Sequence, residues 1–216
     1  MSDDKTISSH YFREITLGLE QHHAIFSKLW QVGKPVFTDK VERAAVTFDS
    51  DGNHLQFLFN CDFWKNCPEI ERNFVICHEC LHIMLNHGIR IRNLDMRLAN
   101  VATDVVINEL LVSGFGFQRS DLTFWADKNA CWIDSVFKKE HSVDADRSME
   151  YYYLLLQKTP SESDANTIDD HSEFVSINSD TLSRILNDVF ESVSEIDKQS
   201  LGNIMSDGNP DEIEDA

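Results

Sequence analysis

Residues 74–87, FVICHECLHIMLNH, decide the fold of this chain because they combine a helical apolar period with the sequence H-E-x-x-H. The apolar residues recur at steps of three and four, which predicts a helix with one buried face. Pro68 fits the first turn of this helix, and we expect the helix to reach about His87-Gly88. Four residues along a helix turn by about 400° and rise by about 6 Å, so His78 and His82 project from the same face.

Two histidines at this spacing predict a metal site on the helix. Both imidazoles can ligate one Zn²⁺, and Glu79, directly after the first histidine, can take a proton from water on that metal. With 9 His in 216 residues, the pattern arises by chance in roughly 2–3% of chains of this composition. We therefore predict that His78 and His82 bind zinc and that Glu79 is a general base.

A catalytic zinc normally has three protein ligands, so a third must come from elsewhere in the chain. We favour Asp104, because it lies in an expected helix over 95–112 that is otherwise rich in Ala, Val and Ile. A carboxylate buried there needs a cation or several donors. Asp104 shares one polar stripe with Arg97, Asn100 and Asn108. Arg97 is the alternative partner of Asp104, whereas Asn108 could orient a ligand.

His87 is the alternative third ligand. It follows His82 by five residues, which on a straight helix places it about 140° around the axis, facing away from His82. A histidine at the end of a helix also interacts favourably with the helix dipole without binding metal. Both His87 and Asp104 are therefore candidates, and the helical geometry favours Asp104.

The rest of the chain predicts an α+β domain that is mainly helical. The spacing of apolar residues indicates further helices over 9–31, 147–157 and 179–194. Residues 43–49 and 54–59 are β-like, and the Asp-Gly pair between them predicts a hairpin, hence a small antiparallel sheet. Residues 115–145 are aromatic-rich and irregular by pattern.

The chain is acidic, with a net charge of −18, and this charge argues against nucleic acid or an anionic membrane as partner. No apolar run is long enough to cross a membrane, and the start, MSDDKTISSHYFRE, lacks the features of a secretory signal. Five cysteines without an export signal are expected to be reduced thiols. We therefore expect a cytoplasmic protein.

The charge is uneven along the chain, which bears on domain organisation. Residues 161–216 hold 15 Asp and Glu but only two basic residues. We expect one domain over 1–206, with the metal site within 68–112 and an acidic portion from about 161. Residues 207–216 have a composition typical of a disordered acidic tail.

The motif helix, followed by LANVATDVVIN over 98–108, resembles a family of metallopeptidase domains found in bacteria and phages. In that family a von Willebrand factor A-like domain often follows. The resemblance covers roughly residues 20–175. The spacing from His82 to Asp104 is similar to that of gluzincins, with Asp in place of the usual Glu. It implies a zincin-like fold, bound zinc, and hydrolysis of peptide bonds in a peptide or protein substrate.

Two further expectations accompany the predicted peptidase function. Residues 54–59 are the candidate edge strand that aligns an extended substrate by backbone pairing. An oxyanion donor is needed, and His171, Tyr151 and Tyr152 are candidates. The alternative function is a zinc-binding regulatory or interaction module without catalysis, with the acidic C-terminal third as its partner surface. The sequence leaves the oligomeric state open.

Overall fold

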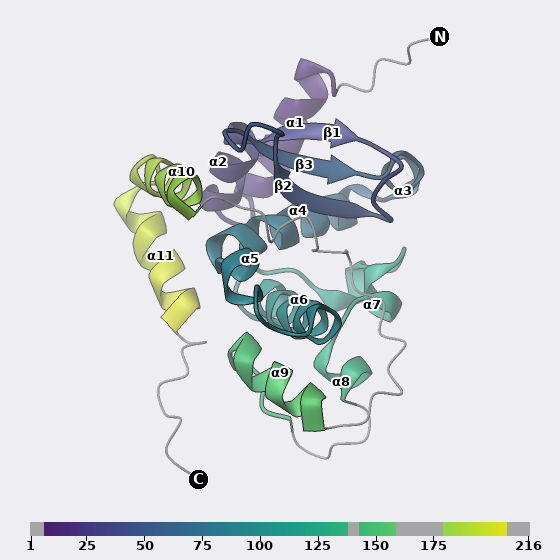
Figure 1. Ribbon diagram of the computed structural model, residues 1–216. Helices are drawn as coiled ribbons and strands as arrows, with labels where there is room; N and C mark the ends of the chain where they lie inside the picture. Colours follow the sequence, from purple (N-terminus) through teal and green to yellow (C-terminus); the bar gives the residue numbers. More distant parts are fainter. Residues whose placement is uncertain (1–6, 138–142, 159–178, 207–216) are drawn as a thin grey trace.

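The computed structural model describes residues 7–137, 143–158 and 179–206. The expected tail over 207–216 and His171 lie outside the described residues. Along the described parts, helices predominate and a small sheet covers one side (Figure 1). No helix in these parts is long and apolar enough to cross a membrane.

The first predicted helix is in fact two helices, α1 (Ser9–Glu20) and α2 (Ala24–Val32). His23 separates them, because its backbone is extended and its Nδ1 accepts a hydrogen bond from the Ile25 N–H at 3.1 Å. An acceptor in this position caps the first turn of α2. The apolar spacing continues through the break, so the prediction of one helix over 9–31 was wrong.

The sheet has three strands in the order β1-β3-β2: β1 (Lys34–Phe37), β2 (Ala44–Phe48) and β3 (Leu55–Phe59). The predicted antiparallel hairpin of β2 and β3 is confirmed, with Gly52 at positive φ in its turn. However, β1 pairs in parallel with β3, so the sheet is mixed and the prediction of an antiparallel sheet was wrong. Pro35 obscures β1 in the sequence, yet an edge strand tolerates a residue without an N–H.

Two long helices lie behind the sheet. The motif helix, α4 (Glu69–Met84), contacts β2 and α2 on one side and α6 (Met96–Ser113) on the other (Figure 1). α6 begins as predicted, because the Asp95 side chain accepts a hydrogen bond from the Leu98 N–H. Short α3 (Cys61–Asn66) precedes α4, and α5 (His87–Arg90) follows it.

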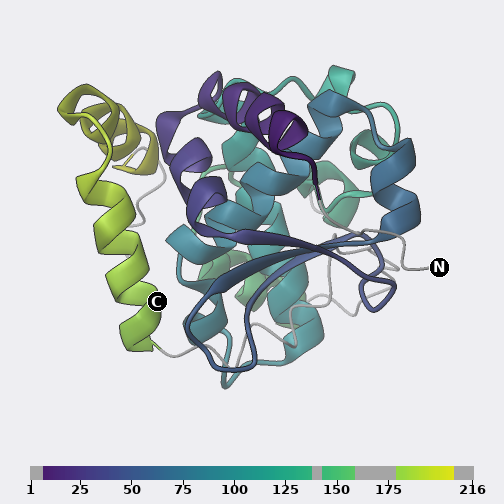
Figure 2. The same ribbon diagram turned by 90° about the horizontal axis from the view of Figure 1, so that it is seen from above.

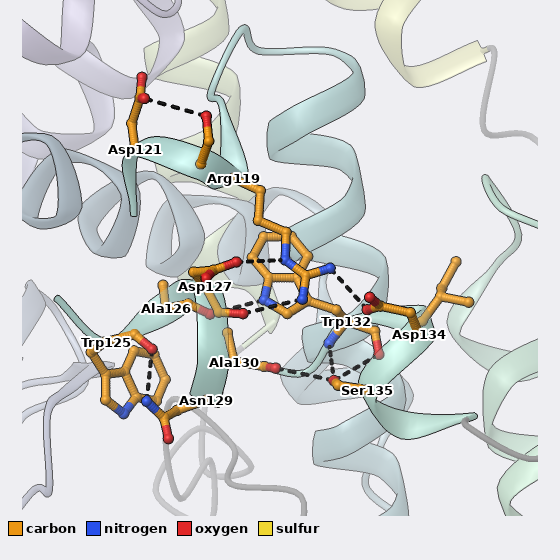
Figure 3. Close-up of polar contacts among 12 residues, drawn as sticks. Arg119, Asp121, Trp125, Ala126, Asp127, Asn129, Ala130, Trp132, Asp134 and Ser135 are labelled. Carbon is orange, nitrogen blue, oxygen red and sulfur yellow. Dashed lines mark hydrogen bonds and ion pairs between the residues drawn. The ribbon is translucent and has the colours of Figure 1, made fainter. Parts of the chain in front are cut away.

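Residues 115–137 form a compact irregular segment, as predicted, with only short helical turns: η1 (Arg119–Asp121), α7 (Ala126–Asn129) and α8 (Ile133–Val136). Figure 3 shows how Arg119 holds this segment together. Its guanidinium bonds to Asp127 and Asp134 and lies 4.6 Å from the centre of the Trp132 ring. The segment is attached to α4 by the buried Glu71 carboxylate, which accepts three backbone N–H bonds from residues 124–126.

Three helices complete the described chain: α9 (Met149–Lys158), α10 (Ser179–Glu191) and α11 (Glu195–Ser206). α9 packs on α6, on the side away from α4, whereas α10 packs on α2 (Figure 1). Figure 2 shows α10 and α11 along one side of the molecule. The spacing of apolar residues predicted α9 and α10, whereas α11 was not predicted.

Candidate metal centre

The structure brings three side chains from two helices to one point. His78 and His82 extend from α4 with their Nε2 atoms 3.0 Å apart. Asp104 extends from α6, and its Oδ1 lies 3.5 Å from His78 Nε2 and 3.4 Å from His82 Nε2. Among the described residues, these three form the group whose donor atoms could share a metal ion. Each is at most 1% exposed.

The triangle of donor atoms fits a tetrahedral metal ion. Donors at about 2.0–2.1 Å from a tetrahedral zinc lie about 3.3–3.4 Å from one another. The three observed separations, from 3.0 to 3.5 Å, bracket this value. Two imidazoles and one carboxylate are also a donor set typical of zinc sites that leave a fourth position open. The residues present therefore fit zinc in both chemistry and spacing.

Asn108 fixes which nitrogen of His78 faces the other donors. Its Nδ2 donates to the Cys131 carbonyl at 3.0 Å, so its Oδ1 faces His78 Nδ1 at 2.9 Å. An amide oxygen only accepts, hence His78 carries its proton on Nδ1 and presents the Nε2 lone pair toward His82 and Asp104. A hydrogen bond of this kind orients a metal-binding imidazole and strengthens it as a ligand.

His87 lies on the far side of the His82 ring from Asp104. The α4 helix ends at Met84, and Asn86 adopts a left-handed conformation with φ of 56°. The chain therefore turns, and His87 Nδ1 comes within 3.1 Å of His82 Nδ1. The predicted helix end near His87-Gly88 was wrong, and so was the expectation that His87 faces away. His87 contacts the nitrogen of His82 opposite to the one facing Asp104.

Glu79 is as deeply buried as the histidines. Its side chain is 0% exposed, and it lies on α4 directly after His78. Burial raises the pKa of the neighbouring Cys80 thiol, and the negative charge of Glu79 adds to this rise. Its place one residue after His78 on α4 keeps it the candidate proton acceptor for a group bound beside the histidines.

Residues 16–148 match the family model described as "Putative metallopeptidase domain". The match covers more than half of the chain. This protein belongs to that family. Neither a curated protein nor a solved structure gives a significant match. The predicted membership of a metallopeptidase domain family is thus confirmed over residues 16–148, a region that contains all of α4 and α6. Family membership supports a metal-dependent, protease-like function.

The cysteines of this metallopeptidase family member are not part of the donor group. All five are free thiols, and Cys77 and Cys80 are fully buried in the core. Burial raises the pKa of both thiols well above the usual range. They therefore remain protonated and pack as small core residues.

Arg43 is a cation whose charge acts on Cys131, and no pattern in the sequence predicted this. Arg43 precedes β2, and its guanidinium lies 4.3 Å from the centre of the Trp125 ring. Burial raises the pKa of the Cys131 thiol; the charge of Asp104 adds to the rise, and the charge of Arg43 opposes it. Both charges thus act on one thiol beside the donor group. No motif marks Arg43, because only the fold of β2 over α4 brings it there.

Neither tyrosine candidate lies beside the donor triangle. Tyr151 and Tyr152 are on α9, which packs on α6 on the side away from α4 (Figure 1). The Tyr152 hydroxyl donates to the Asp144 carbonyl at 2.9 Å. The candidate edge strand was also wrong, since β3 is the central strand of the sheet. Of the described strands, β2 is the outer strand that contacts α4.

Proposed function

We propose that this protein is a zinc-dependent peptidase in which His78, His82 and Asp104 hold the metal and Glu79 is the general base. The observation that carries the proposal is the buried triangle of three donors with separations of 3.0 to 3.5 Å, with Glu79 beside it in the sequence. Zinc bound there would supply Lewis acidity and lower the pKa of a water ligand to near neutrality.

The protein groups have distinct roles in this proposal. The Glu79 carboxylate accepts a proton from the attacking water at one oxygen and later delivers it to the leaving amine nitrogen. Asn108 holds His78 in the tautomer whose Nε2 is free of a proton. His87 contacts Nδ1 of His82 and thereby fixes the plane of that ring. Glu79 acts on the reaction itself, and the other two position ligands.

The outer edge of β2 is the proposed place for an extended substrate. The Asn60 N–H donates to the Arg43 carbonyl, and the Asp49 N–H donates to the His54 carbonyl. Because these bonds alternate along an antiparallel pair, Ala44 and Val46 direct their backbone groups away from β3. A further strand could pair with these groups only once the edge is uncovered, because Ala44 and Val46 are 0% and 2% exposed in the structure.

The decisive experiment compares Glu79→Gln with wild type on a mixed peptide library, with zinc measured in both proteins. We expect each to hold about one zinc per chain, while cleavage by the variant falls by about 10²–10⁴-fold. Glu69→Gln, on the exposed first turn of the same helix, is the matched control and should cleave normally. Equal cleavage by wild type and Glu79→Gln would refute the assigned role.

A second candidate function is a zinc-binding regulatory or interaction module without catalysis. The observation that favours it is burial, because the three donor residues and Glu79 are all at most 1% exposed. A catalytic metal must meet water and substrate, whereas a structural metal need not. Stoichiometric zinc without cleavage of any library member by wild type would support this second function over the first.

A further inference from the structure

A second feature of the molecule is a groove on the side of α6 away from the metal centre. It has a volume of about 870 Å³ and lies where the end of α4, α5, α6, the start of α9 and the end of α11 meet. This volume is within the range of about 300–1,000 Å³ that is typical of ligand pockets. It accommodates several side chains, but not a whole helix.

The groove is separate from the proposed peptidase site. Each residue of a helix turns the side chain by about 100°, so Val106, Glu109 and Ser113 point about 140–200° away from Asp104. These three residues line the groove. Ile204 and Met205 of α11 form another wall, and they lie beyond the region matched by the family model. The helices that follow the matched region thus complete the groove.

The apolar lining is rich in methionine. Met84, Met149 and Met205 all line the groove, although the whole chain contains only 5 methionines. Methionine side chains are flexible and polarisable, and they are frequent on surfaces that bind apolar helix faces. Leu85, Val106 and Leu110 extend the same lining. The flexible methionine side chains of the groove can therefore adjust their packing to the apolar surface of a partner.

The cations of the groove are already engaged. Arg90 donates from Nε and Nη2 to the Glu150 carboxylate at 2.6–3.0 Å, and from Nη1 to the Leu85 carbonyl. Arg147 donates to Asp144 at 2.8 Å. The positive charges lining the groove therefore each have an acidic partner within this protein.

Two acidic residues that line the groove, unlike its arginines, have no ion-pair partner in the described parts of the chain. Glu109 and Asp146 make no ion pair within 4 Å with any residue in the described parts of the chain. One Glu109 oxygen accepts the Ile133 N–H at 2.9 Å. Burial raises the pKa of Glu109; the Ile133 N–H bond and the charge of Arg119 oppose this rise, whereas the charges of Asp134 and Asp146 add to it. A cation brought to Glu109 would be stabilised by this negative field.

We propose that this groove binds an amphipathic helix of a partner protein, with apolar side chains on the methionine wall and a Lys or Arg at Glu109. Helices bind grooves in this way through apolar residues on one face, spaced three and four apart. The acidic chain, with net charge −18, also attracts a basic partner from a distance. The inference does not depend on the peptidase function.

The test is a fluorescence-anisotropy titration with a labelled synthetic peptide of leucine and lysine, arranged to place the leucines on one helical face. The protein carries Glu79→Gln, so that the probe is not cut, and salt is about 0.15 M to screen distant charges. We expect Glu109→Gln to weaken binding roughly tenfold. Glu191→Gln, an equal charge change on the exposed end of α10, should change it less than about twofold.

A second variant tests the contribution of the apolar wall to binding. Met205→Ser should weaken binding about fivefold, because it removes apolar contact from the rim of the groove. Circular dichroism and zinc content of each variant establish that the fold and the metal centre are intact. Weaker binding in Glu109→Gln and Met205→Ser, with zinc unchanged, supports the groove whether or not the protein cleaves peptides.

Several results would overturn the proposal. Equal weakening by Glu109→Gln and Glu191→Gln would mean that bulk charge alone attracts the peptide. Equal binding of a scrambled leucine–lysine peptide would exclude recognition of a helix face, and so would an absence of saturable binding. Complete displacement by a small diamine would indicate a site for small cations. A dimer of this protein that the peptide dissociates would assign the groove to a second copy of the chain.

Discussion

The two faces of α6 carry carboxylates that differ in burial and in the groups around them. Asp104 faces α4, is fully buried, and lies within 3.5 Å of two imidazole nitrogens. Glu109 faces the groove, is only partly buried, and accepts one backbone N–H. Five residues of one helix, which place the two side chains about 140° apart around its axis, thus separate a carboxylate beside two imidazoles from one that faces a groove. The surroundings of each carboxylate decide its chemistry, and its residue type alone does not.

The largest expected effect comes from removing the carboxylate on the buried face. Asp104→Ala should abolish stoichiometric zinc, because two imidazoles alone hold the ion weakly. Glu109→Ala makes the matched change on the other face of the same helix and should leave zinc at wild-type content. Elemental analysis after dialysis measures both. If both variants lose zinc alike, α6 as a whole supports the site and the contrast between its faces disappears.

A smaller effect on the buried face is expected from Asn108→Ala. Asn108 bonds to His78 Nδ1 at 2.9 Å and to the Cys131 carbonyl at 3.0 Å. Loss of a group that orients a metal-binding imidazole typically weakens metal affinity by about 10–100-fold. Competition with a chromophoric chelator measures this affinity. Ser113→Ala, on the groove face, is the control and should match wild type; equal affinity in both variants would exclude an orienting role for Asn108.

Local signals in the sequence predicted the parts of the molecule that depend on local geometry. The spacing of His78 and His82 on a helix, the cap at Asp95 and the hairpin turn at Gly52 each follow from a few neighbouring residues, and the structure contains all three. Asp104 was singled out because a carboxylate is costly in an apolar helix. The structure places it beside both histidines.

The features that the sequence did not predict depend on contacts between distant segments. β1 is a strand because β3 pairs with it, although Pro35 weakens its local preference. His87 meets His82 because Asn86 turns the chain with a positive φ, and a straight helix would have separated them. The charge of Arg43 acts on the Cys131 thiol only because β2 packs on α4. No spacing within the sequence encodes these three contacts.

The smallest expected effect concerns the side of the molecule that carries the groove. α11, which forms one groove wall, is tied to the junction of α1 and α2 by His23. His23 accepts the Ile25 N–H at Nδ1, so it must carry its proton on Nε2, which donates to the Asp197 carbonyl at 3.1 Å. Only the neutral ring can make both bonds. Burial lowers the pKa of His23, and the Asp197 hydrogen bond only partly offsets this.

The sign of the pH effect follows from that lowered pKa. Below about pH 6.5 an unfolded histidine takes up a proton, whereas folded His23 does not until the pH reaches its lower pKa. The unfolded state therefore binds more protons, and the free energy of unfolding falls as the pH drops from about 6.5 towards the lowered pKa. The loss should be about 1 kcal/mol, the typical contribution of a helix cap.

The matched variant for this prediction is His23→Asn, because an Asn side chain caps a helix without titrating. Urea unfolding at pH 7.5 and at pH 5 gives the free energy of unfolding of both proteins. We expect wild type to lose about 1 kcal/mol more than His23→Asn between these two values. His22, whose pKa burial also lowers, is present in both proteins, so its contribution cancels in the difference. Parallel losses in the two proteins would show that the pKa of His23 is the same in the folded and unfolded states, and would refute the prediction.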